Sequence, residues 1–171
     1  MAAAGAVIQA RMGSKRFPGK VLQQLGDGCL LGQALKRVQL LNNFRVVVAT
    51  TTLQEDEDIV DFCRDNRVGC YRGSSEDVLG RFYEASLALG CSYICRITAD
   101  CPLISPSLIT AVANLVGAGI CDYAAVQTQG MPAFPDGLDS ECMTFAALRN
   151  SNLRCTKTVQ REHVTSYIKE N

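Results

Sequence analysis

Two spacings of apolar residues alternate along this chain. Continuous apolar runs, rich in β-branched residues, predict short buried strands at 6–8, 46–49, 69–71, 93–97, 123–126 and 138–143. Apolar residues at helical spacing predict helices between them, at 31–41, 55–63, 79–89 and 106–116. Apolar strands that alternate with helices indicate a mainly parallel sheet that is covered on both faces. We therefore expect an α/β fold of three layers with a Rossmann-like arrangement.

The pattern continues through all 171 residues without an internal repeat, a low-complexity tract or a Pro/Ser-rich linker. A chain of this length is typical of one domain, so we expect residues 1–171 to form a single domain. The 17 basic residues balance the 17 acidic residues. Because nucleic-acid binders need a basic surplus to neutralise phosphates, this balance argues against a nucleic-acid partner.

The sequence also favours a cytoplasmic location. Its small apolar start has no basic residue before the apolar stretch, unlike a secretion leader, and is too short to span a membrane. The chain has nine cysteines, an odd number, without a CxxC pair, and His163 is the only histidine, which disfavours a zinc site. We expect reduced cysteines that act as small core residues, and no membrane partner.

Ligands of such sheets bind at the carboxyl ends of the strands, so the loops after residues 10, 49, 71 and 97 are expected to line the site. The first of these loops, QARMGSKRFPGK at 9–20, contains four cations and two glycines. Glycine lets the backbone approach a phosphate closely, and Arg and Lys neutralise its charge. The loop differs from the P-loop of kinases and NTPases, because five residues separate Gly13 from Gly19 and Val21 replaces the magnesium-binding Ser or Thr.

The 9–20 loop and the VLQQLGDG turn after it resemble the nucleotidyltransferases that activate sugars. Further matches are VATT at 48–51, RGSSEDVLGRF at 72–82, RITADCPL at 96–103, GLDSE at 137–141 and REHVT at 161–165. The chain resembles the spore-coat polysaccharide biosynthesis cytidylyltransferase-like family, which is related to the CMP-Kdo and CMP-acylneuraminate synthetases. The resemblance implies a nucleotide-diphospho-sugar transferase fold with a mixed sheet. It also implies an Mg²⁺-dependent enzyme of polysaccharide biosynthesis that joins CTP to a sugar or sugar acid and releases pyrophosphate.

Roles for single residues follow from this resemblance and from their chemistry. Asp100 comes just after the 93–97 strand, where Mg²⁺ that bridges triphosphate oxygens needs a carboxylate. Arg11 and Lys20 are expected to hold the triphosphate and, with Asp100, to stabilise the charge that develops at the α-phosphorus. The expected nucleotide-binding residues are Gln9, Ala10, Arg11, Gly13, Lys20, Thr50, Ser74 and Arg81. For the last three, a role as turn or helix-cap residues is equally compatible with the sequence.

Three residues are candidates for the acceptor side. Asp139 and Glu141 alternate on one face of the predicted strand, where they bind the sugar or the metal or face solvent. The resemblance places the segment of His163 near the acceptor, and this histidine is either structural or in contact with the substrate. The acceptor itself is left open between the anomeric hydroxyl of an acidic sugar and a sugar phosphate.

A non-catalytic nucleotide- or sugar-binding module of a larger assembly is the alternative function. The resemblance further implies that family members continue beyond 161–165 into another strand and a carboxylate-rich stretch, which this chain lacks. We expect its absence to remove metal ligands and to leave an apolar surface uncovered. The expected consequences are weak turnover and self-association as a homodimer.

Overall fold

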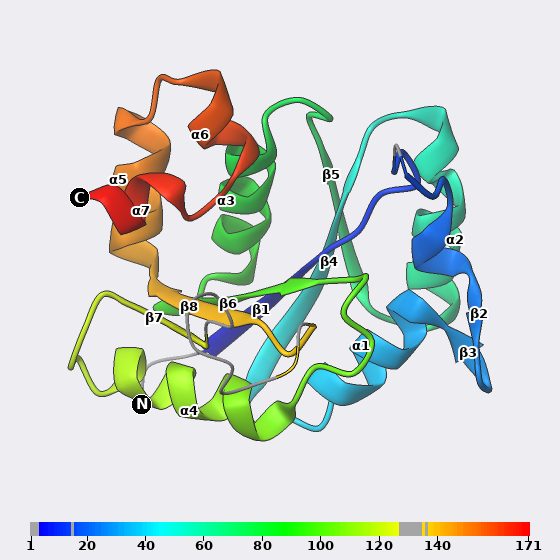
Figure 1. The fold of residues 1–171 in the computed structure, drawn as a ribbon, viewed down its shortest axis with the longest axis horizontal. Coiled ribbons are helices and arrows are strands. Elements are labelled where there is room, and N and C mark those ends of the chain that lie inside the picture. The colour runs from blue at the N-terminus through cyan, green and yellow to red at the C-terminus, as the bar shows by residue number, and fades with distance from the viewer. Residues whose placement is uncertain (1–3, 15, 127–134, 136) are drawn as a thin grey trace.

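The computed structural model describes residues 4–14, 16–126, 135 and 137–171. Lys15, one of the four cations of the 9–20 loop, lies outside the described residues. One sheet of six strands, in the order β5-β4-β1-β6-β8-β7, forms the centre of the fold (Figure 1). The strands are β1 (Ala4–Gln9), β4 (Phe44–Thr51), β5 (Gly69–Gly73), β6 (Tyr93–Thr98), β7 (Tyr123–Val126) and β8 (Ser140–Thr144). β8 is antiparallel to both of its neighbours and β1, β4, β5 and β6 are parallel, so the sheet is mixed.

Helices cover both faces of this sheet, which confirms the predicted α/β fold of three layers (Figure 1). The helices are α1 (Leu30–Val38), α2 (Glu57–Asp65), α3 (Val78–Leu89), α4 (Pro106–Gly117), α5 (Phe145–Arg154), α6 (Thr158–Glu162) and α7 (Ser166–Glu170). Two 3-10 turns, at Lys20–Leu22 and Gln54–Asp56, and a small hairpin of β2 (Gln24–Leu25) and β3 (Gly28–Cys29) complete the elements. No helix of the described residues is long and apolar enough to cross a bilayer.

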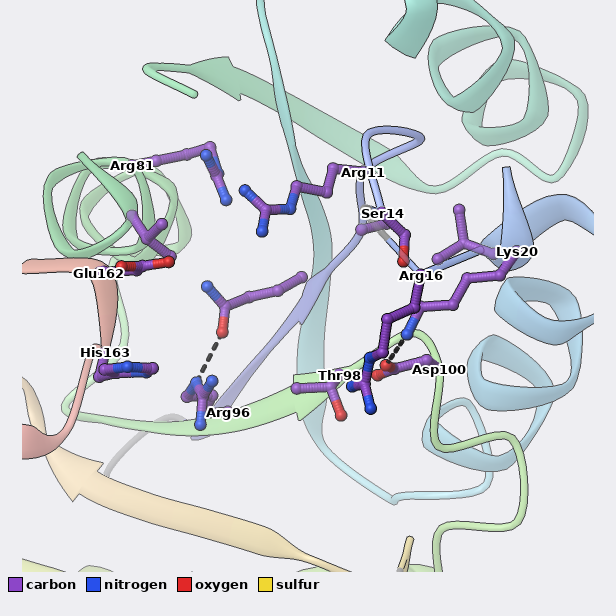
Figure 2. Close-up of a pocket in the computed structure, with 14 residues that line it drawn as sticks. Arg11, Ser14, Arg16, Lys20, Arg81, Arg96, Thr98, Asp100, Glu162 and His163 are labelled. Atoms are coloured by element: carbon purple, nitrogen blue, oxygen red, sulfur yellow. Dashed lines mark hydrogen bonds and ion pairs between the residues drawn. The ribbon is translucent and has the colours of Figure 1, made fainter. Parts of the chain in front are cut away.

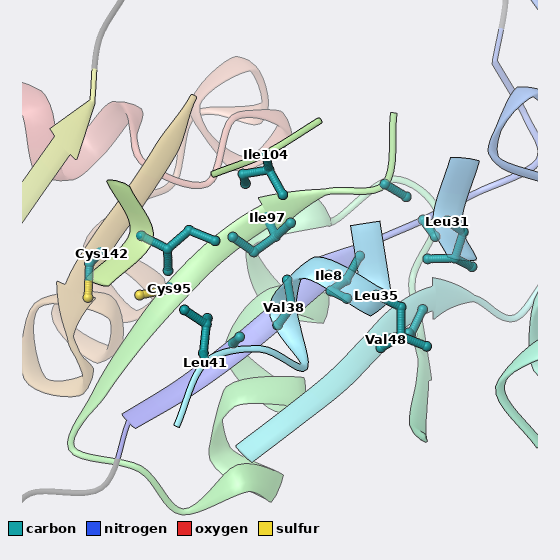
Figure 3. Packing of buried hydrophobic residues seen from close by; sticks show 14 of the residues in the cluster. Ile8, Leu31, Leu35, Val38, Leu41, Val48, Cys95, Ile97, Ile104 and Cys142 are labelled. Atoms are coloured by element: carbon teal, nitrogen blue, oxygen red, sulfur yellow. The ribbon is translucent and has the colours of Figure 1, made fainter. Parts of the chain in front are cut away.

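The core has two halves because successive side chains of a strand point to opposite faces. Ile8, Val48 and Ile97 lie on the face that packs against α1 and α4, and Figure 3 shows them beside Leu31 and Val38. The opposite face of the same strands packs against α3 and α5 through Val7, Val47, Ile94, Phe82 and Leu148. Both faces of the central strands are therefore apolar, which is the pattern that the continuous runs predict.

The predicted helices and strands are present with shifted ends, but the sequence interpretation missed the C-terminal helices. The strand predicted at 138–143 is β8, which begins at Ser140. Thr144 ends that strand and caps α5, since its hydroxyl accepts a hydrogen bond from the Ala147 amide at 3.1 Å. Helices α5 and α6 lie beside α3 (Figure 1). This position brings residues 162 and 163 to the carboxyl end of the sheet.

None of the nine cysteines, all of which lie among the described residues, is in a disulfide bond. Cys95 and Cys142 are opposite each other on β6 and β8, and both are fully buried. We expect alkylation of the unfolded, non-reduced protein to modify nine thiols, because none is in a disulfide and the five buried ones fill the core as small apolar groups. Intact-mass spectrometry measures the number of alkyl groups, and a reproducible native disulfide would contradict the expectation.

Candidate active site

A cavity of about 400 Å³ opens at the carboxyl ends of β1 and β6 (Figure 2). The two strands are parallel neighbours in which Gln9 is opposite Thr98, so the segments that follow them leave the sheet side by side. The start of α3 and residues 162–163 form the facing walls. The lining residues are Gln9, Ala10, Arg11, Ser14, Arg16, Lys20, Val21, Val78, Arg81, Arg96, Thr98, Asp100, Glu162 and His163.

The loop after β1 is shaped by two backbone contacts and one buried carboxyl. The amides of Ser14 and Gly19 both donate to the carbonyl of Met12, at 2.7 and 2.9 Å, which closes the loop on itself. Gly19 has φ 72°, a left-handed conformation that glycine adopts without strain, and the 3-10 turn begins at Lys20. Asp56, fully buried, accepts from the amide of Met12 at 2.7 Å and from the amide of Thr51 at 3.1 Å. The entry to the loop is thereby fixed to the end of β4.

Lys20 and Asp100 form an ion pair at one end of the cavity (Figure 2). Partial burial opposes ionisation of Asp100, but the hydrogen bond and charge of Lys20 outweigh it, so the pKa of Asp100 lies below its ordinary value. The carboxyl side chain is 40% exposed, which leaves it accessible from the cavity. The Lys20–Asp100 pair therefore places a cation and an accessible carboxylate side by side at this end of the cavity.

We expect Lys20→Ala to weaken the binding of a nucleoside triphosphate by about 10- to 150-fold, the equivalent of about 1.5–3 kcal/mol for hydrogen bonds to charged groups. Isothermal calorimetry measures the affinity. Lys36→Ala is the matched control, because Lys36 is an exposed lysine that pairs with Asp27 away from the cavity. Unchanged affinity in both Lys20→Ala and Arg11→Ala would exclude the loop from the site.

Two further cations, Arg11 and Arg81, face each other across the cavity (Figure 2). Arg81 is 4% exposed, and it donates through Nη1 to the carbonyl of Ser74. Its Nε is buried and has no hydrogen-bond partner among the described residues. Burial and the neighbouring charge of Arg11 lower the pKa of Arg81. Two converging guanidinium groups form a site that attracts an anion.

Arg96 also lines the cavity, and the sequence interpretation did not select it. Its Nε donates to Oε1 of Gln9 at 2.6 Å, and its Nη1 donates to Oε2 of Glu141 at 2.7 Å. The sequence signal for Arg96 is that a charged residue interrupts the apolar 93–97 run. A charged side chain that is half-buried in a strand needs a partner. The partner was not predictable, because Arg96 and Glu141 are opposite each other only through the antiparallel pairing of β6 with β8.

Glu141 lies beneath the cavity wall and does not line it. It is 8% exposed and accepts hydrogen bonds from the hydroxyls of Tyr123, at 2.6 Å, and Thr165, at 3.0 Å. Lys169 of α7 lies 2.7 Å from its Oε1. Burial alone would raise the pKa of Glu141, but the charge of Arg96 and these hydrogen bonds lower it to about 2. Glu141 therefore neither contacts the cavity nor faces solvent.

The cavity includes some of the predicted site residues and leaves out others. Gln9, Ala10, Arg11, Lys20, Arg81, Asp100 and His163 line it, whereas Gly13, Thr50, Ser74, Asp139 and Glu141 do not. Thr50 is fully buried. The Ser74 hydroxyl accepts a hydrogen bond from the amide of Asp77 at 3.0 Å, so Ser74 has the turn or helix-cap role that was the alternative to nucleotide binding. Besides Arg96, the sequence interpretation did not select Ser14, Arg16, Val21, Val78, Thr98 and Glu162.

One ion pair holds the C-terminal wall of the cavity. Arg161 donates to both carboxylate oxygens of Asp77, at 2.9 and 2.7 Å, and to the carbonyls of Asn152 and Cys155, at 3.1 and 3.0 Å. It thereby joins the start of α3 to the end of α5. The next two residues, Glu162 and His163, face the cavity (Figure 2).

Comparison with known proteins gives consistent matches. A family model described as Cytidylyltransferase matches residues 5–130. An uncharacterized protein of Methanocaldococcus jannaschii is 42% identical over 166 residues, which cover 96% of this chain and 66% of that protein. The spore coat polysaccharide biosynthesis protein SpsF of Bacillus subtilis is 32% identical over 169 residues, which cover 95% of this chain and 68% of that protein.

The structure of a cytidylyltransferase from Leptospira borgpetersenii matches the fold. Its TM-score is 0.91 at 32% sequence identity, and the match covers 100% of this chain and 72% of that chain. This chain spans about two thirds of the length of the two curated relatives, at 66% and 68%.

Proposed function

We propose that this chain, which belongs to the cytidylyltransferase family, transfers the cytidylyl group of CTP to a sugar or sugar acid and releases pyrophosphate. The observation that carries the proposal is the convergence of Arg11, Lys20 and Arg81 with the accessible carboxylate of Asp100 in one cavity. Three cations suit a triphosphate, and the carboxylate suits the metal that accompanies it. The spore coat polysaccharide biosynthesis protein SpsF supports polysaccharide synthesis as the setting.

The residues of the cavity support a direct, in-line transfer. A sugar hydroxyl oxygen attacks the α-phosphorus of CTP and gives up its proton to water. The bond between the α-phosphorus and the α,β-bridging oxygen breaks, and pyrophosphate leaves, without a covalent enzyme intermediate. Arg11 and Lys20 stabilise the negative charge that develops on the phosphoryl oxygens, because their charges are already in position before the reaction. The phosphates of CTP compete with Asp100 for Lys20, so nucleotide binding frees the carboxylate.

Asp100 is the residue that we propose to hold Mg²⁺. Among the described residues there is no group of three His, Cys, Asp or Glu side chains that could hold a metal ion. One carboxylate is nevertheless sufficient, because Mg²⁺ in such sites is bound by one or two carboxylates together with substrate phosphates and water. Asp100 would hold the ion, which when bound would offset the negative charge of the triphosphate.

A screen for pyrophosphate release tests the proposed function. Purified protein is incubated with Mg²⁺, each of the four nucleoside triphosphates, and a panel of sugars, sugar acids and sugar phosphates. We expect release with CTP and one class of acceptor. Tight CTP binding without pyrophosphate release from any combination would contradict the proposed enzyme activity and favour the non-catalytic binding module.

Homodimer formation and a cytoplasmic location stay predictions from the sequence.

A further inference from the structure

Residues 162 and 163 form the wall of the cavity opposite Lys20 and Asp100. Figure 2 shows Lys20 and Asp100 at one side of the cavity, and Glu162 and His163 at the other. The side chains of Glu162 and His163 line the cavity and have no hydrogen bond or ion pair among the residues that the structure describes. Both side chains are therefore available to a ligand, and the proposed phosphate contacts use neither of them.

The backbone is fixed on both sides of His163. Arg161, two positions before it, donates to both carboxylate oxygens of Asp77. Val164 and Thr165, which follow it directly, are buried. The side chain of His163 is nevertheless exposed, and it is the one histidine of the chain. The fold thus holds an imidazole at a fixed point of the cavity wall.

An in-line transfer determines the side from which the acceptor must come. In such a reaction the attacking and leaving oxygens lie on opposite sides of the phosphorus. Lys20 is one of the cations that we propose to hold the triphosphate, and Arg16 lies at the same side of the cavity (Figure 2). The pyrophosphate end of the nucleotide belongs at these cations. The acceptor hydroxyl therefore approaches the α-phosphorus from the side of Glu162 and His163.

The attacking hydroxyl needs a group that takes its proton. Among the ionisable residues of the cavity, the arginines and Lys20 are donors and cannot accept a proton. Asp100 is paired with Lys20. Glu162 and His163 remain. Histidine is the better general base, because its unperturbed charge change falls between about pH 5 and 8, near the pH at which the reaction runs.

We propose that His163 is the general base of the transfer. The proposal rests on the proposed function, because it assigns the proton of the acceptor hydroxyl to a residue of this chain. One ring nitrogen of the neutral imidazole takes this proton while the hydroxyl oxygen forms its bond to the α-phosphorus. The electron pair of the broken bond leaves with pyrophosphate. The imidazolium then gives the proton to water, so the proton reaches water through His163.

Charged groups surround His163 on several elements. Those that share the cavity at its side are Arg81 of α3, Arg96 of β6 and Glu162 of α6. Behind this wall lie the paired side chains of Asp77, Arg161, Glu141 and Lys169. Among the cavity groups at this side, Glu162 is the one anion, and its carboxylate offsets the positive charge that His163 carries after it takes the proton.

The dependence of the rate on pH tests this role. Pyrophosphate release is measured with saturating CTP, acceptor and Mg²⁺ from about pH 5 to 9. We expect the wild-type rate to fall on the acid side as the imidazole becomes protonated. His163→Gln should lower kcat by about 10²- to 10⁴-fold, the range for general acid–base catalysis, and should lose this acid-side fall. Its affinity for CTP, measured by calorimetry, should equal that of the wild type.

Chemical rescue and two further variants separate a base from a structural role. The rate of His163→Ala should rise with the concentration of added imidazole, which a structural histidine would not explain. Glu162→Gln should keep the acid-side fall and lower kcat less than His163→Gln does. Val159→Ala changes an exposed position of α6 outside the cavity lining and should have no effect.

Three results would overturn the proposal: a wild-type pH profile in His163→Gln, a rate of His163→Ala that does not respond to imidazole, or an acid-side fall that is lost in Glu162→Gln instead. The failure of the proposed function looks different. No release by the wild type with any acceptor would contradict the function and the base together, whereas release that His163→Gln leaves unchanged would contradict the base alone.

Discussion

Asp100→Asn should reduce the rate of pyrophosphate release by about 10²- to 10³-fold, because the variant keeps the shape of the side chain but loses the charge that a metal ion needs. Asp100 is 40% exposed at the cavity, so the fold does not depend on it. The substitution also removes the ionic partner of Lys20. Lys20 would then be free to bind phosphate, so we expect CTP binding without metal to be retained while turnover is lost.

Initial rates over a range of Mg²⁺ concentrations measure this effect, and calorimetry without metal measures CTP affinity. Asp58→Asn is the matched control, because Asp58 is an exposed aspartate of α2 away from the cavity. Thermal unfolding of both variants checks that the fold is intact. Near-full activity of Asp100→Asn at low Mg²⁺ would show that Asp100 does not bind the metal.

Glu141→Ala should lower the free energy of unfolding by about 3–5 kcal/mol, the range for removing one partner of a buried ion pair. The cause is the loss of the one carboxylate that joins Arg96, Lys169 and Tyr123. Without it, half-buried Arg96 has no anionic partner among the residues described in the structure. This one side chain connects strand β8, helix α7 and the wall of the cavity. We therefore expect its removal to cost more free energy of unfolding than removal of any exposed carboxylate.

The pH dependence of stability distinguishes the charge of Glu141 from its packing. Its pKa is about 2 in the folded protein, below the ordinary 4.5, so the ionised group stabilises the fold above about pH 4.5. This stabilisation, on the order of 3 kcal/mol at about 1.4 kcal/mol per pH unit, is lost as the pH falls from 4.5 towards 2. Denaturant unfolding should show a weaker acid dependence in Glu141→Gln than in the wild type. Glu84→Gln, on the exposed side of α3, is the control, and an acid dependence of Glu141→Gln equal to that of the wild type would contradict the assignment.

The fold was predictable from the sequence because its central strands are apolar on both faces and its first four long helices have clear helical spacing. Helix α5 was missed because its sequence, FAALRNSNLR, buries only Leu148 and Ser151 and has no long apolar stripe. Helices α6 and α7 have five residues each and bury no residue completely, so spacing cannot reveal them. Local patterns identify elements that cover the sheet, and they do not identify short elements that pack on other helices.

The candidate site was predictable where its residues follow a strand directly, as Arg11 and Asp100 do. It was not predictable where a side chain depends on pairing between distant segments. Arg96 and Glu141 are 45 positions apart, and nothing local indicates that they are opposite each other. Asp56 is a similar case, because its sequence position predicts a residue that opens a helix, whereas its carboxyl binds the amide of Met12, 44 positions away.

That contact of Asp56 affects how fast and how tightly a ligand can bind. Because Asp56 fixes the backbone of Met12, the start of the loop is ordered before any ligand arrives. The conformational entropy of this part of the chain is lost on folding and does not have to be lost again on binding. For the triphosphate that we propose as ligand, the backbone at Met12 therefore adds no ordering cost on binding, and this preorganisation favours rapid association.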